Sequence, residues 1–262
     1  MLDTHPHFPP GFDKTVAQDC AKLVIEAYAQ FNDFLHGKLW KIPDDYEELA
    51  RIWATPPGVI QRKEPFGFVA RQRTSRVVFV TFRGTQSLED WLSNLTFHQM
   101  PHDAGAEWGQ VETGFNLLYQ QCTVSVVQGV KAAGAAPRVI VTGHSLGGAL
   151  ATLATADLTI NGIAAEMYSM AAPRTGDPAF AAKFNSTVNA AWRLANTEDI
   201  VTTVPLATPK LMMGAVPLGL FSAMLALANR LDFQHVGVPV SFTAHLGSIT
   251  ANHDMGVYSR FI

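Results

Sequence analysis

The sequence predicts an α/β fold with a mostly parallel central sheet flanked by helices. Short apolar runs rich in β-branched residues alternate with segments of helical periodicity along the 262 residues. Several of these runs are apolar throughout, which is typical of strands covered on both faces. No linker, repeat or low-complexity segment interrupts the chain. We therefore expect residues 1–262 to form one domain, long enough to bury a large core without disulfides or metals.

The first half of the chain predicts two helices and two strands. Residues 13–36 and 113–133 repeat apolar side chains at helical spacing. Residues 66–70 and 77–82 are strand-like and are separated by the polar turn 72–75.

The second half predicts the regular alternation of a parallel sheet. Residues 138–142 form a short β-branched run that leads directly into an apolar helix. The expected elements that follow in order are helix 146–159, strand 167–171, helix 177–187, strand 191–195 and strand 236–240.

Cysteine usage and motif content argue against metals and organic cofactors. Cys20 and Cys122 are the only cysteines, and each falls on the apolar face of an expected helix. Two buried thiols are the favoured interpretation, with a disulfide between them as the alternative. Neither has a Cys or His at ligand spacing, and the chain lacks His-Glu-x-x-His and the dinucleotide glycine fingerprint. We expect no metal site and no cofactor.

The charge balance limits the classes of partner. Lys and Arg number 19 against 22 Asp and Glu, a formal net charge of -3. This gives no basic footprint for nucleic acid. The N-terminus lacks a basic start followed by an apolar run, so it carries no recognisable signal peptide. We expect a cytoplasmic protein, or a secreted one whose leader has been removed.

A candidate nucleophile follows the strand at residues 138–142. Gly143-His144-Ser145-Leu146-Gly147 has the G-x-S-x-G pattern at the junction of a strand and a helix. A serine there stands on a sharp turn, and only small residues fit two positions to either side. The helix N-terminus would direct its N–H groups at developing negative charge, and the N–H of Leu146 is the first candidate donor.

Candidate acids and bases lie downstream of Ser145. Asp199 follows the strand at residues 191–195, at the edge of the sheet where α/β sites form. Asp157 is interpreted as a solvated side chain three turns along a helix, and Asp177 as a helix N-cap before a proline. His253 lies in an expected loop able to reach the site. His235 is expected to lead into a strand.

Together these residues resemble the class 3 lipase family, the fungal-type triacylglycerol lipases of the α/β-hydrolase superfamily. The resemblance covers residues 66–262 and rests on T-F-R-G-T at 81–85, W-L-S-N-L at 91–95, Gly114-Phe115, G-H-S-L-G-G-A at 143–149, A-P-R-T-G-D at 172–177, N-T-E-D-I-V at 196–201 and His253. It implies the α/β-hydrolase fold with Ser145 as nucleophile, Asp199 as acid and His253 as base. It also implies an oxyanion hole from Thr85 and Leu146. His144, beside the nucleophile, is interpreted as structural.

The resemblance implies a serine carboxylic-ester hydrolase. The expected reaction is hydrolysis of acylglycerol esters at an oil–water interface through an acyl-enzyme. A feruloyl esterase or a phospholipase A1 would use the same triad. From another class, a lipase-like binding module would lack turnover and a member of the triad, whereas all three candidates are present here.

A short amphipathic segment follows Thr85. Leu88, Trp91, Leu92 and Leu95 fall at i, i+3, i+4 and i+7, after a Ser-x-x-Asp capping pattern. The family reading makes residues 86–95 a lid helix over the acyl-binding groove. The alternative is one more core helix.

The chain departs from the family between Pro205 and His235, which lie between Asp199 and His253. Residues 206–231 form an apolar insertion, and residues 211–229 carry no charge. A single membrane span there would separate two members of one triad, so no transmembrane segment is expected. We expect a second cap or an interface-binding surface, with an extra core or dimer-interface helix as the alternative.

Overall fold

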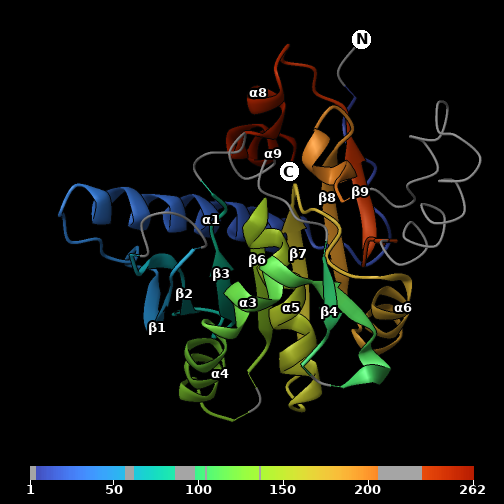
Figure 1. Ribbon diagram of the computed structural model, residues 1–262. Coiled ribbons are helices and arrows are strands. Elements are labelled where there is room, and N and C mark those ends of the chain that lie inside the picture. The colour runs from blue at the N-terminus through green and yellow to red at the C-terminus, as the bar shows by residue number, and fades with distance from the viewer. Residues whose placement is uncertain (1–3, 57–61, 86–97, 104, 136, 206–231) are drawn as a thin grey trace, which may run out of the picture.

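The computed structural model describes residues 4–56, 62–85, 98–103, 105–135, 137–205 and 232–262. Its centre is a sheet in the order β1-β2-β3-β6-β7-β8-β9 (Figure 1). The strands are β1 (Tyr46–Ala54), β2 (Glu64–Gln72), β3 (Val78–Phe82), β6 (Val139–His144), β7 (Ala165–Met170), β8 (Ala191–Asn196) and β9 (Val238–Phe242). The first three pair antiparallel, and β3, β6, β7, β8 and β9 are parallel neighbours. The predicted mostly parallel sheet is confirmed.

Helices cover both faces of this sheet and divide the core in two. On one face, α1 (Lys14–Leu35) and α9 (Met255–Phe261) pack with Phe68, Phe79 and Tyr168. The opposite face carries α3 (Thr113–Gln120), α4 (Thr123–Ala132), α5 (Leu146–Ile160) and α6 (Pro178–Thr187). The three layers can be followed in Figure 1.

Local sequence explains where the main helices begin. The Asp13 carboxylate accepts the N–H groups of Thr15 and Val16, which caps α1. Asp177 accepts the N–H of Phe180 at 2.7 Å and stands before a proline, as predicted for the start of α6. Helix α5 consists mostly of apolar and small residues and is buried almost throughout. It therefore forms the fixed support under the centre of the sheet.

The structure corrects several expected elements. Residues 113–133 form α3 and α4, because tight turns join Gln121 N–H to Leu118 O and Cys122 N–H to Tyr119 O between them. His253 ends a short helix, α8 (Ile249–His253), where a loop was expected. The sequence also missed β1, the hairpin of β4 (Gln99–Pro101) and β5 (Gln110–Glu112), and the short helices η1 (Ala106–Trp108) and η2 (Ile200–Thr203).

Both cysteines are buried free thiols, as the favoured interpretation predicted. Cys20 belongs to the core cluster of α1, and Cys122 to the cluster on the other face of the sheet. The sheet therefore separates them, which rules out the alternative disulfide. Burial raises the pKa of the Cys122 thiol to about 12, so it stays protonated and unreactive.

Candidate active site

The predicted triad residues follow β6, β8 and β9, which run parallel in the same half of the sheet (Figure 1). Ser145 directly follows β6, and Asp199 follows β8 as the N-cap of η2. His253 lies in α8, beyond β9. Because these strands are parallel, their carboxyl ends meet at the same edge, and that edge is where α/β folds place their ligands.

Ser145 occupies a strained turn between β6 and α5. Its backbone has φ 59° and ψ -130°, a left-handed conformation that is uncommon outside glycine. The Ser145 N–H donates to Met170 O of β7 at 3.0 Å, and its carbonyl accepts the Gly148 N–H at 2.8 Å. The turn is thus held from the neighbouring strand and from the helix that it begins. Strain of this kind concentrates at functional sites.

The two glycines of the motif are required by close backbone contacts. A Cβ on Gly143 would lie 2.1 Å from the carbonyl oxygen of Gly147. A Cβ on Gly147 would lie 2.5 Å from the carbonyl oxygen of Arg83, at the end of β3. Any side chain at either position would push α5 away from the sheet. The predicted steric reason for the G-x-S-x-G pattern therefore applies here.

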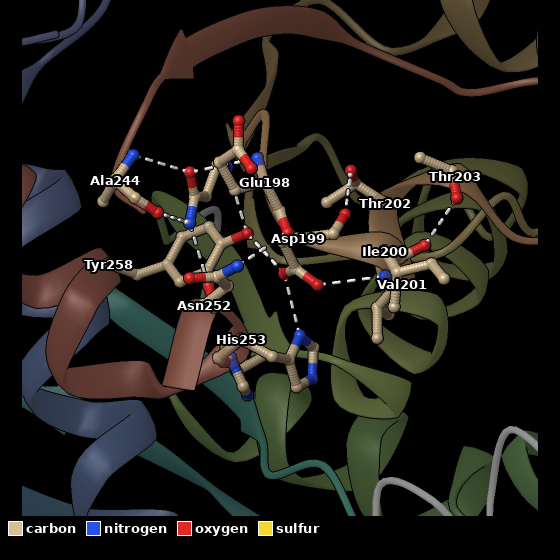
Figure 2. A network of polar contacts seen from close by, with 12 residues as sticks. Glu198, Asp199, Ile200, Val201, Thr202, Thr203, Ala244, Asn252, His253 and Tyr258 are labelled. Atoms are coloured by element: carbon tan, nitrogen blue, oxygen red, sulfur yellow. Dashed lines mark hydrogen bonds and ion pairs between the residues drawn. The ribbon is translucent and has the colours of Figure 1, made fainter. Parts of the chain in front are cut away.

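Asp199 and His253 form a buried hydrogen-bonded pair (Figure 2). The Asp199 side chain is fully buried, and its Oδ2 lies 2.8 Å from His253 Nδ1. Its Oδ1 accepts the Val201 N–H at 2.9 Å. A carboxylate only accepts hydrogen bonds, so neutral His253 carries its proton on Nδ1. The lone pair of the imidazole is then on Nε2.

The atoms that would exchange a proton are both buried and both available. Among the described residues, neither Ser145 Oγ nor His253 Nε2 has a hydrogen-bond partner. Ser145 is 1% exposed and His253 is 6% exposed. Buried polar atoms rarely stay unpaired without a functional reason. The arrangement suits a hydroxyl that becomes engaged only when a substrate is bound.

Tyr258 is a third donor to the carboxylate, and the sequence analysis did not identify it. Its hydroxyl donates to Asp199 Oδ2 at 2.6 Å and accepts the Asn196 N–H at 3.1 Å. Burial and the neighbouring Asp199 raise the pKa of Tyr258 well above its ordinary value, so the hydroxyl keeps its proton. Tyr258 therefore helps to hold the Asp199 carboxylate in one orientation (Figure 2).

Two buried asparagines join the segment that carries the acid to the segment that carries the base. The Asn196 amide donates to Ala244 O at 2.9 Å and to Asn252 O at 3.0 Å. In turn, Asn252 donates to Glu198 O at 3.1 Å and accepts the Leu246 N–H at 2.7 Å. These bonds tie the loop after β8 to α8 on both sides of the Asp199–His253 pair. The Asn196 signal was present in the N-T-E-D-I-V motif, whereas Asn252 had none.

His144 is buried and bonded through both ring nitrogens, in agreement with its structural interpretation. Nε2 lies 2.9 Å from the carbonyl oxygen of His253, and Nδ1 lies 2.9 Å from the Tyr28 hydroxyl. Burial, reinforced by the nearby His253, holds the pKa of His144 well below its ordinary value. A neutral ring with both nitrogens engaged cannot act as a second general base.

The other downstream acids and histidines have partners away from the proposed triad. His235 Nε2 bonds to Thr202 O at 2.7 Å, and His245 Nδ1 lies 3.1 Å from Glu198. Asp157 was expected to be a solvated side chain, and this prediction is wrong. The side chain is half-buried and accepts the Tyr119 hydroxyl at 2.8 Å. Burial raises the pKa of Asp157.

The predicted oxyanion donors lie beside the serine turn. Leu146 is the first residue of α5, so its N–H has no acceptor within the helix. A Cβ on Gly84 would lie 2.7 Å from Ser145 Cβ, which shows that the segment leading to Thr85 runs directly past the serine. Thr85 is half-buried. This position beside the serine turn is compatible with the expected role of Thr85 as an oxyanion donor.

Both predicted apolar additions lie outside the described residues. This applies to the lid helix 86–95, with Leu88, Trp91, Leu92 and Leu95, and to the insertion 206–231. Within the described ranges, no helix is both long and apolar enough to cross a membrane. The same ranges contain no group of three His, Cys, Asp or Glu side chains that could hold a metal ion.

Comparison with known proteins gives one family and one fold. Residues 79–208 match the sequence profile of the family described as lipase (class 3). The chain is 30% identical over 187 residues to secreted mono- and diacylglycerol lipase 1 of Fusarium solani, which covers 68% of this chain and 55% of that protein. It is 32% identical over 174 residues to the chloroplastic phospholipase A(1) DAD1 of Arabidopsis thaliana, over 58% of this chain and 38% of that protein.

The fold comparison agrees with the sequence matches. Lipase II from Rhizopus niveus superimposes with a TM-score of 0.66 at 23% identity, over 91% of this chain and 83% of that one. The match to the Fusarium protein leaves almost half of that protein's length unmatched, since the chain spans 55% of it. The family match at residues 79–208 includes the serine turn and Asp199.

Proposed function

We propose, since the chain belongs to the class 3 lipase family of the α/β-hydrolase superfamily, that it is a serine carboxylic-ester hydrolase acting on acylglycerols. In this proposal Ser145 is the nucleophile, His253 the general base and Asp199 the acid that orients it. The relative from Fusarium solani is named a secreted lipase, which favours the secreted one of the two expected locations.

One observation carries the proposal: within the described part of the chain, Nε2 of the buried Asp199–His253 pair has no hydrogen-bond partner, and neither has the Ser145 hydroxyl. The carboxylate fixes the Nδ1–H tautomer, so Nε2 can only accept a proton. A nucleophile, a base and a group that orients the base are the three components of nucleophilic catalysis by serine. The strained turn of Ser145 presents the hydroxyl at the edge of the sheet.

The proposed reaction passes through an acyl-enzyme. His253 Nε2 takes the proton of Ser145 as Oγ attacks the ester carbonyl, and a tetrahedral oxyanion forms. The imidazolium then protonates the leaving alcohol, and the C–O bond of the ester breaks. Water repeats the sequence on the acyl-serine, which releases the acid and the free hydroxyl. Asp199 stays ionised and stabilises the imidazolium at both stages.

The oxyanion would be held by the N–H groups of Leu146 and Thr85. The first begins α5, where the helix dipole adds partial positive charge. The second follows the segment that passes beside Ser145. Fixed donors of this kind do not reorganise during the reaction, and each is worth about 10²–10³ in turnover.

A phospholipase A1 is the second candidate, because one relative carries that name. It would use the same three residues and differ only in the head group of the ester it accepts. The wild-type protein should be assayed on p-nitrophenyl esters of graded chain length, an emulsified triacylglycerol, a phosphatidylcholine and a feruloyl ester. Fastest turnover on the acylglycerol supports the proposal, and preference for phosphatidylcholine or the feruloyl ester would replace it.

The triad assignment is tested by Ser145→Ala, which should abolish ester hydrolysis without changing the fold. Ser169→Ala is the matched control. Ser169 lies on the adjacent strand β7, is 1% exposed and also has an unpartnered hydroxyl among the described residues. The control should retain wild-type turnover. Persistent hydrolysis by Ser145→Ala would refute the assignment, and a wild-type protein without hydrolysis would favour a binding module.

A further inference from the structure

The backbone of Gly84 is held at both of its polar groups, by the side chain of Tyr28 from α1 and by that of the preceding residue, Arg83. Its N–H donates to the Tyr28 hydroxyl of α1 at 3.0 Å. Its carbonyl oxygen accepts Nη1 of Arg83 at 2.7 Å. Neither side chain has a part in the reaction proposed above. Both bonds lie immediately before Thr85, whose N–H is a proposed oxyanion donor.

Arg83 is itself fixed in an unusual way for a charged side chain. It is 1% exposed, and each nitrogen of its guanidinium donates to a different acceptor. Nε bonds to Pro65 O at 2.7 Å and Nη2 to Glu64 at 2.5 Å, while Nη1 holds Gly84. The guanidinium lies between the rings of Phe31 and Phe66, 3.7 and 4.4 Å from their centroids. A planar guanidinium held by three hydrogen bonds and two aromatic rings has little freedom to move, so it fixes the position of the Gly84 carbonyl that it contacts.

Tyr28 connects Gly84 to His144, the neighbour of Ser145, and through His144 to His253. A carbonyl oxygen only accepts, so His144 Nε2 carries the proton that it donates to His253 O. The neutral ring then accepts at Nδ1, and its donor is the Tyr28 hydroxyl at 2.9 Å. The Tyr28 oxygen in turn accepts the Gly84 N–H. One hydroxyl thus links the oxyanion segment, the turn of Ser145 and the helix of His253.

From these contacts we infer that Tyr28 and Arg83 are positioning residues that preset the oxyanion hole by clamping the Gly84 backbone. The inference rests on the proposed esterase function. The Gly84 carbonyl and the Thr85 N–H belong to one planar trans peptide and point in opposite directions. Because the Gly84 carbonyl is fixed by Arg83, the Thr85 N–H is directed away from the Arg83 guanidinium. The Tyr28 bond keeps Gly84 close to Ser145, so close that a Cβ added to Gly84 would lie 2.7 Å from Ser145 Cβ.

The decisive variant is Tyr28→Phe, which removes one oxygen and keeps the half-buried ring. Release of the Gly84 N–H should misalign the donor and lower kcat on a dissolved p-nitrophenyl ester by about 10- to 100-fold. The KM should stay within about twofold, because the donor acts on the transition state and not on the ground state. The free energy of unfolding of Tyr28→Phe should change less than its activation free energy does.

A boronic acid provides a readout that a purely structural role would not change in this way. It forms a tetrahedral adduct on a serine Oγ and places an anionic oxygen where the oxyanion would lie. For Tyr28→Phe, its Ki should rise by the same factor by which kcat/KM falls. The matched control is Tyr168→Phe, because the Tyr168 hydroxyl is also buried and accepts a backbone N–H, that of Asp13 at 3.4 Å. The control should leave both quantities unchanged.

Arg83→Lys tests the other side of the clamp. A lysine keeps the charge near Glu64 but cannot hold three acceptors in the fixed geometry of a guanidinium. It should show the same parallel change in Ki and kcat/KM. The loss of kcat/KM in the double variant should be smaller than the product of the two single losses, because either change alone already releases the backbone of Gly84.

The outcomes separate this inference from the proposed function. Wild type compared with Ser145→Ala decides first whether the protein is a serine esterase. If it is, a Tyr28→Phe variant with kcat within twofold of wild type would overturn the inference. A fall in kcat without a matching rise in the boronic acid Ki would overturn it as well. Fully multiplicative losses in the double variant would show that Tyr28 and Arg83 do not act together on the backbone of Gly84.

Discussion

At the scale of single residues, the site is defined by which atoms can donate and which can only accept. The Asp199 carboxylate receives three donors: the Val201 N–H, His253 Nδ1 and the Tyr258 hydroxyl. Every donor fits an ionised carboxylate, and none would fit an amide nitrogen. The tautomer of His253, and with it the lone pair on Nε2, follows from this arrangement.

Asp199→Asn should therefore inactivate the protein while leaving most of the fold intact. The new amide nitrogen must face either the Val201 N–H or the pair formed by His253 and Tyr258, so one donor always meets another. If His253 changes its tautomer to resolve the conflict, Nε2 loses its lone pair. The same change in a serine protease triad lowers turnover by about 10⁴. We expect a loss of about 10³–10⁴ in kcat, measured on a p-nitrophenyl ester.

Asp157→Asn is the control for this change. Asp157 also accepts a tyrosine hydroxyl, from Tyr119 at 2.8 Å, and lies near the far end of α5 from Ser145. An asparagine there can still accept that bond through its oxygen. We expect unchanged kcat for the control. An Asp199→Asn variant within tenfold of wild type would show that another residue supplies the acid.

Ser145, Asp199 and His253 could be proposed from the sequence because local signals mark them. Ser145 lies in a glycine-spaced motif, Asp199 follows a strand, and His253 lies in an expected loop able to reach the site. The supporting tyrosines could not. Tyr28 lies 116 residues from His144, and Tyr258 lies 59 residues from Asp199. Each is an ordinary aromatic residue on an apolar helix face, and only the packing of α1 and α9 against the sheet reveals its hydroxyl as functional.

At the scale of elements, the path from β6 through the Ser145 turn into α5 leaves no space for added atoms. Gly147→Ala would place a Cβ 2.5 Å from Arg83 O and 2.7 Å from Phe82 O. Both are backbone atoms, so α5 or the end of β3 must shift. We expect a loss of about 1–3 kcal/mol in the free energy of unfolding. Turnover should fall as well, since the displaced carbonyl immediately precedes Gly84.

Gly114→Ala is the control at the same scale. A Cβ there would approach only the carboxylate of Glu112, with a nearest atom at 3.1 Å. Within α3, alanine is favoured over glycine by about 1 kcal/mol. The control should be neutral or stabilised in urea unfolding, with unchanged turnover. Equal stability of Gly147→Ala and wild type would contradict the steric account of the motif.

The same scale shows why some elements were missed. Strand β1 has irregular register between Glu48 and Ala50 and between Ile52 and Trp53, which breaks the alternation that marks a half-buried strand. Continuous periodicity across residues 113–133 hid the break between α3 and α4, because both helices pack on the same core cluster. The central parallel strands were predicted because they are apolar on both faces.

At the scale of the whole molecule, only 16% of the residues are charged, and two cores, one on each face of the sheet, explain part of this low fraction. The same burial encloses histidines in neutral form. Burial is the first cause that lowers the pKa of His102, His144 and His235, in the last case to about 3. The His144 and His235 rings bond to their neighbours, and all three rings resist protonation while the protein is folded.

These buried histidines predict that stability falls in mild acid. Above pH 6.5 the rings are neutral in both states and contribute nothing. Below it the unfolded chain binds protons that the folded chain does not, so the free energy of unfolding decreases as pH falls. Each histidine contributes up to about 1.4 kcal/mol per pH unit, and Asp157, with its raised pKa, opposes them as one group. Urea unfolding should show a clearly lower free energy of unfolding at pH 5 than at pH 7. The variant His235→Gln should reduce this difference. The control His7→Gln, at an exposed position, should leave it unchanged. Equal stability at the two pH values would contradict the buried neutral state of these rings.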